Sequence, residues 1–118
     1  MKNLIYLCLL SVTLLVACGK EDDPIDNPGD CATTNYTYNT DMASIFDGNC
    51  ATAGCHTTSA KAGGHDLSTY AGIIATGTSK IVAAVDHTGG VPMPYLQPKL
   101  PDATIQKIKC WVSKGAVQ

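Results

Sequence analysis

Cys50-Ala51-Thr52-Ala53-Gly54-Cys55-His56 is the stretch that constrains this 118-residue chain most strongly. It places two thiols and an imidazole close together, with four residues between the cysteines. Two cysteines followed directly by a histidine are typical of covalent haem attachment, in which the thiols bond to the porphyrin edge and the histidine binds the iron. The usual motif has only two residues between the cysteines, so this loop must bulge. Gly54 can adopt the backbone angles that such a bulge needs.

A second interpretation uses the same residues. Cys50 and Cys55 would close a small disulfide loop, and His56 would be a solvated loop residue. The preceding segment favours haem, because residues 40–49 predict a short capped helix that leads into the first cysteine. Its N-cap is Thr40 or Asp41, and its apolar face is formed by Met42, Ile45 and Phe46.

The segments downstream complete an ordered set. Residues 67–70 are followed by Val91-Pro92-Met93-Pro94 and then by a terminal helix that contains Trp111. This order resembles class I monohaem cytochrome c, which often occurs in bacterial lipoproteins and as modules in larger haem proteins. The resemblance covers residues 40–116 and implies an all-α domain wrapped around one covalently bound haem c. Cys50 and Cys55 would then carry the thioethers, and His56 would be the proximal ligand.

Met93 lies in a proline-rich loop, where four prolines between residues 92 and 101 exclude a helix and stiffen the chain. In the resembling family, this is the place of the methionine that binds the sixth position of the iron. The alternatives are that Met93 fills a gap in the core, or that His87 or His65 is the sixth ligand.

The first thirty residues predict export and anchoring. Residues 1–17 have the charge and apolar run of a signal peptide, and Leu15-Val16-Ala17-Cys18 matches a bacterial lipobox. Processing would leave Cys18 as the acylated first residue of a protein without a transmembrane helix. Residues 18–30 are acidic and interrupted by proline and glycine, which predicts a flexible tether. Residues 31–118 form the predicted domain.

Charge limits the possible partners of that domain. Residues 31–118 hold six lysines and five aspartates, which leaves a net charge near +1. Nucleic-acid binding would need a clustered basic face, so it is not expected. The expected partners are redox proteins and, through the lipid, a bacterial membrane on its periplasmic or cell-surface side. Docking to redox partners should gain little from long-range electrostatic steering.

The cysteine count leaves one further pair. Cys8 lies inside the signal peptide and Cys18 takes the lipid, so Cys31 and Cys110 remain once Cys50 and Cys55 are assigned to haem. Outside the cytoplasm such a pair usually forms a disulfide, and in the resembling fold the terminal segments touch. A free Cys110 thiol stays possible, and so do mixed pairings if haem is absent.

The remaining segments predict three more features. Residues 57–66 read as a loop passing over the haem edge. Short helices should follow N-caps at Ser68 and Ser79. A terminal helix should start at the cap Asp102 and stop at Gly115. Its apolar face should consist of Ile105, Ile108 and Val112, with Trp111 beside them.

The resulting expectation is an exported, lipid-anchored cytochrome c that passes single electrons and is not an enzyme. Three rival interpretations remain. One is a haem-free, disulfide-stapled binding lipoprotein. Another is a haem sensor or enzyme in which Met93 does not bind and the sixth site is open. The third is a zinc site at Cys50, Cys55 and His56, which lacks a fourth ligand at a usual spacing.

Overall fold

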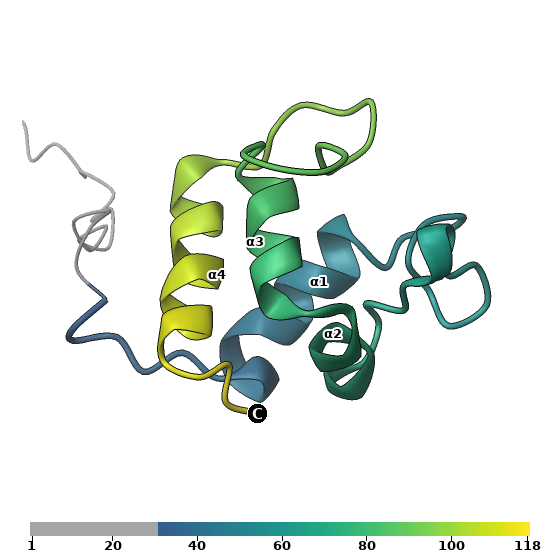
Figure 1. The fold of residues 1–118 in the computed structure, drawn as a ribbon. Helices are drawn as coiled ribbons and strands as arrows, with labels where there is room; N and C mark the ends of the chain where they lie inside the picture. The colour runs from purple at the N-terminus through teal and green to yellow at the C-terminus, as the bar shows by residue number, and fades with distance from the viewer. Residues whose placement is uncertain (1–30) are drawn as a thin grey trace, which may run out of the picture.

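The structure is a computed structural model that describes residues 31–118 (Figure 1). Its elements are η1 (Tyr38–Met42), α1 (Ala43–Asn49), η2 (Ala62–Gly64), α2 (Tyr70–Thr76), α3 (Thr78–Val85) and α4 (Asp102–Ser113). All regular elements within residues 31–118 are helical, which confirms the predicted all-α class. None of these helices is long and apolar enough to cross a membrane. The predicted signal peptide, lipobox and tether lie outside the described residues.

The first helix begins earlier than the sequence predicts. Thr37, and not Thr40 or Asp41, is the N-cap, and its hydroxyl accepts a hydrogen bond from the Thr40 N–H at 3.3 Å. Asp41 reaches back, since its carboxylate accepts from the Thr37 N–H at 2.9 Å. Hydrogen bonds from the Thr40 hydroxyl and the Thr37 amide hold the pKa of Asp41 below its ordinary value. This reciprocal cap adds η1 in front of α1.

The predicted cap of α2 is wrong by one residue. The hydroxyl of Thr69, rather than Ser68, caps α2 by accepting from the Gly72 N–H at 3.1 Å. Ser68 is already occupied, because its hydroxyl donates to the Asp66 carboxylate at 2.6 Å.

The starts of α3 and α4 also differ from the prediction. Gly77, with φ +94°, precedes α3 in place of Ser79, and α3 begins at Thr78. Pro101 precedes α4, and Asp102 is the first helical residue with no side-chain cap bond. The predicted stop is confirmed, since Gly115 has φ +91° just after α4 ends.

Phe46 of α1 and Trp111 of α4 form the centre of the core. Both are fully buried, and their rings meet edge-on with centroids 6.1 Å apart. The other fully buried large side chains are Met42, Ile73 and Ile108. The core therefore joins the first and last helices of the described region to α2, as the arrangement in Figure 1 shows.

The C-terminal residues tie three elements together through their carbonyl groups. The Val117 carbonyl accepts from the Trp111 indole at 2.8 Å and from the Tyr38 amide at 3.0 Å. The Ala116 carbonyl accepts from the Tyr70 hydroxyl at 3.0 Å. The chain end is thus hydrogen-bonded to η1, α2 and α4.

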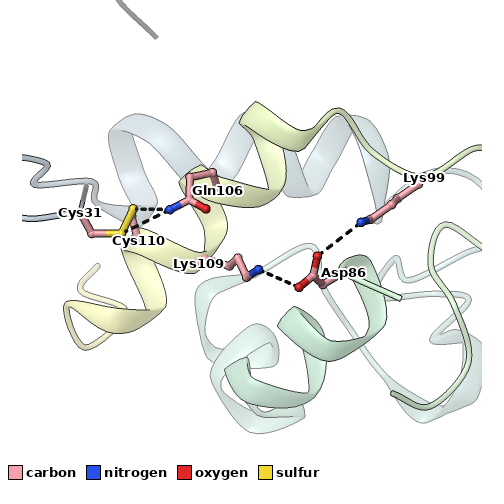
Figure 2. Close-up of polar contacts among 6 residues, drawn as sticks. All are labelled: Cys31, Asp86, Lys99, Gln106, Lys109 and Cys110. Carbon is pink, nitrogen blue, oxygen red and sulfur yellow. Dashed lines mark hydrogen bonds and ion pairs between the residues drawn. A yellow bond between two sulfur atoms is a disulfide. The ribbon is translucent and has the colours of Figure 1, made fainter. Parts of the chain in front are cut away.

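A disulfide joins Cys31, before η1, to Cys110 of α4, with the Cα atoms 5.1 Å apart (Figure 2). The amide of Gln106, one turn earlier on α4, lies against both sulfurs at 3.6 and 3.5 Å. The bond spans 79 residues of sequence. It restrains the unfolded chain over nearly the whole described region.

Replacing both Cys31 and Cys110 by serine should lower the free energy of unfolding by roughly 2–4 kcal/mol, because the unfolded chain regains loop entropy. Thermal denaturation followed by circular dichroism measures this loss. Peptide mapping without reductant should recover the two cysteine peptides as one linked species. Two alkylatable thiols at these positions in the folded wild type would contradict the bond.

Candidate haem-attachment site

Cys50 directly follows α1, a helix that contributes Phe46 to the core. Cys50 is the C-cap of α1, and its N–H donates to the Phe46 carbonyl at 2.8 Å. Because Phe46 is fully buried against Trp111, the backbone of Cys50 is held by the best-packed part of the domain. Cys50 itself is half-buried and Cys55 is exposed, and both are free thiols.

The long spacing between the cysteines is taken up by a turn. The Cys55 N–H donates to the Thr52 carbonyl at 2.9 Å, and the His56 N–H donates back to the Cys50 carbonyl at 3.1 Å. Gly54 has φ +79°, which confirms the left-handed backbone expected there. The turn therefore returns Cys55 and His56 to Cys50 in spite of the two additional residues.

The ring of His56 is oriented by a backbone carbonyl. Its Nδ1 lies 3.2 Å from the carbonyl oxygen of His65, and since that oxygen only accepts, Nδ1 carries the proton. The other nitrogen, Nε2, is then the one with a free lone pair in the neutral ring. Histidines that bind metals are commonly held in this way. The Leu67 N–H also donates to the His56 carbonyl at 2.8 Å, which fixes the peptide on its other side.

The two thiols differ in their chemistry. Burial, together with the charge of the neighbouring Cys55, raises the pKa of the Cys50 thiol to about 11. Cys50 thus stays protonated at neutral pH and is a poor thiolate ligand. Within residues 31–118, no group of three or more histidine, cysteine or acidic side chains could hold a metal ion. Cys50, Cys55 and His56 accordingly do not form a preassembled zinc centre.

Met93 lies on a separate loop, between α3 and α4. Its N–H donates to the Ala84 carbonyl at 3.0 Å, and its own carbonyl accepts from Nε2 of His87 at 3.1 Å. The side chain of Met93 is half-buried. In Figure 1 this loop lies at the top of the view, and the loop of residues 50–66 lies at the right.

The rival sixth ligands are engaged elsewhere. His87 uses Nε2 to hold the Met93 carbonyl. Nε2 of His65 lies 3.2 Å from the Lys80 ammonium, which can only donate, so this nitrogen is an acceptor there. These contacts favour Met93 over either histidine as an iron ligand.

The loop around Met93 exposes large apolar side chains. Val91, Tyr95 and Leu96 are 54%, 63% and 84% exposed. Large apolar side chains gain nothing from contact with water, and clustered exposed apolar residues commonly mark a binding surface. The donor set, the orientation of His56 and this apolar loop therefore fit a covalently held haem.

The carbonyl groups of His65 and Ala84 are site components that the sequence does not indicate. Each orients a candidate ligand through the backbone, and any residue type could supply it. Comparison of the chain with protein-family models, with curated proteins and with solved structures finds no match.

Asp86 ties both ends of the Met93 loop to α4. It follows α3 directly, and its carboxylate pairs with Lys109 of α4 at 2.7 Å and with Lys99 at 3.4 Å (Figure 2). The hydrogen bond from Lys109, aided by the one from Lys99, holds the pKa of Asp86 below its ordinary value of 3.8. An acid whose pKa is lowered by folding stabilises the fold when ionised.

Asp86→Asn should be less stable than the wild type at neutral pH. The difference should persist above pH 3.8, the ordinary pKa, and fade as the pH falls through the lower folded-state value, where Asp86 of the wild type is also neutral. Melting temperatures measured from pH 7 into this acid range test the sign. Asp47→Asn, which removes the same charge from an exposed position on α1, is the matched control. Equal curves for Asp86→Asn and wild type would show that the pair does not stabilise the fold.

Proposed function

We propose that the chain is an exported, lipid-anchored monohaem cytochrome c that carries single electrons between redox partners. The observation that carries the proposal is His56 directly after Cys55, with Nδ1 bound to the His65 carbonyl, which leaves the lone pair of the neutral ring on Nε2, where a metal would bind. The same structure bonds Cys31 to Cys110 and leaves Cys50 and Cys55 as free thiols. The disulfide of the domain therefore does not use Cys50 and Cys55, the two thiols that haem attachment would need.

Each residue of the site has a definite part in this proposal. Cys50 and Cys55 form the two thioethers, His56 is the proximal ligand and Met93 the distal one. Haem c, when bound, supplies a one-electron iron couple whose reduced state is favoured by histidine and methionine ligation. With both axial positions taken, no iron site is left for a substrate, so the domain transfers electrons and transforms no substrate.

The protein around the haem has two tasks. The α1 helix and the turn at residues 50–56 hold the proximal side, anchored on Phe46 in the core. The Met93 loop supplies the distal side, and the apolar side chains of Val91, Tyr95 and Leu96 can cover part of the ring and exclude water. Burying an apolar cofactor would also enlarge the core of a small domain.

Expression with a cytochrome c maturation system should give red protein whose Soret band stays with the polypeptide through acid–acetone extraction. Cys50→Ala should leave one thioether or none, because one of the two attaching sulfurs is gone. The control is the Cys31→Ser, Cys110→Ser double variant, which should keep its haem. Colourless wild type from a strain that matures a control cytochrome would refute the proposal and favour the haem-free binding lipoprotein.

Met93→Ala should abolish the weak red charge-transfer band that ferric iron shows with a methionine sulfur. It should also lower the reduction potential and open the iron to cyanide or CO, since the weakly held axial ligand is lost. Gln97→Ala, on the same loop and exposed, is the control and should keep the band. An unchanged Met93→Ala spectrum places the sixth ligand elsewhere. Rapid CO binding by the wild type would favour the open-site sensor or enzyme.

The anchoring part of the proposal depends on Leu15-Val16-Ala17-Cys18, outside the residues that the structure describes. Mass spectrometry of the mature protein should find an acylated Cys18 at the N-terminus. Cys18→Ala should shift the protein from the membrane fraction to the soluble fraction, because the lipid is its only proposed anchor. An N-terminus that still begins with Met1 would contradict this processing.

A further inference from the structure

His87 adopts a backbone conformation that needs an explanation. It is the second residue after α3, and its φ is +59°, in the left-handed region that favours glycine. Histidine enters this region more readily than most residues but still at a cost. Such strain persists where the surrounding contacts require it, often at functional sites. The contact made by its ring is the bond from Nε2 to the Met93 carbonyl at 3.1 Å.

Both backbone polar groups of Met93 are tied to the end of α3. Its N–H is bound to the Ala84 carbonyl at 3.0 Å, and its carbonyl is bound to His87. Pro92 and Pro94 flank Met93 and restrict its neighbours. Asp86 closes the loop further along, through Lys99. The imidazole of His87 is thus the side-chain contact that reaches the peptide of the candidate ligand itself.

We infer that His87 is a positioning residue for Met93, and that its Nε2–H holds the Met93 peptide where the thioether can reach the sixth position of the iron. The inference rests on the proposed function. A neutral thioether is a weak ligand, so the fraction of molecules in which it is bound depends on how well the loop is pre-organised. Loss of a single hydrogen bond of ordinary strength changes the equilibrium constant between bound and released Met93 by up to about tenfold.

Two substitutions separate this role from a purely structural one. His87→Gly removes the donor and also relieves the left-handed strain, so the fold should keep or gain stability. His87→Gln keeps an N–H at the position of the imidazole Nε2 but relieves no strain. Thr88→Gly, at the next and exposed residue, controls for added loop flexibility.

In the ferric holoprotein, His87→Gly should bind cyanide roughly tenfold more tightly than the wild type, because cyanide competes with a less firmly held Met93. Its red charge-transfer band should weaken, while its melting temperature stays equal or rises. His87→Gln and Thr88→Gly should both match the wild type in cyanide affinity and in the band. If His87 only stabilised the fold, cyanide affinity and the red band would not change while the melting temperature stays equal or rises.

Two results would overturn the inference. One is a His87→Gly protein with wild-type cyanide affinity and an unchanged band. The other is an equal change in His87→Gly and His87→Gln, which would mean that the Nε2–H donor is not what matters.

Failure of the proposed function can be told apart from failure of the role inferred for His87. If the wild type carries no haem, the proposed function fails. Hydrogen exchange of the Met93 amide, which donates to the Ala84 carbonyl, then reports in the haem-free protein how firmly His87 holds this part of the loop. Exchange should then be faster in His87→Gly than in His87→Gln. Equal exchange rates in these two variants would refute the positioning role of His87.

Discussion

The edge-on contact between Phe46 and Trp111 is the interaction on which the rest of the domain depends. It packs α1 against α4, and the two rings are among the fully buried side chains of the core. Trp111 also binds the chain end through the Val117 carbonyl, and the Phe46 carbonyl accepts from the Cys50 amide. One packed pair therefore supports both the closure of the fold and the start of the candidate site.

The site combines one residue at the end of a helix with others on loops. Cys50 is held at the end of α1, whereas Cys55 and His56 are placed by a turn that includes Gly54 in a left-handed conformation. The hydrogen bond from the His56 amide to the Cys50 carbonyl closes this turn. Since an oriented ligand loses less freedom on binding, the carbonyl of His65 and the ring of His87 would each reduce the entropic cost of placing His56 and Met93 on the iron of the proposed haem.

Hydrophobic periodicity was sufficient to predict α1 and α4, because Phe46, Ile105 and Ile108 have the spacing of a buried helical face. It gave no signal for η2, which lies within residues 57–66, predicted to be a loop. The helix starts were less predictable. Several side chains compete for the same backbone donors, as Ser68 and Thr69 do, and only the tertiary contacts decide between them. The cysteine count indicated the pairing of Cys31 and Cys110 that the structure contains.

The supporting parts of the site could not be read from the sequence. The carbonyls of His65 and Ala84 act through the backbone, so their residue types carry no signal. The bond between His87 and Met93 links residues six positions apart in a loop with no periodicity. Its prediction requires the left-handed φ of His87, which only the folded chain reveals.

The first and last segments of the described region are joined to each other. Cys31 is bonded to α4, and the Tyr38 amide is bound to the Val117 carbonyl. In Figure 1 the C-terminus lies near η1 at the bottom of the view, while the loop of residues 50–66 lies at the right and the Met93 loop at the top. Fusion of another protein to either of these segments would therefore leave the two candidate loops uncovered.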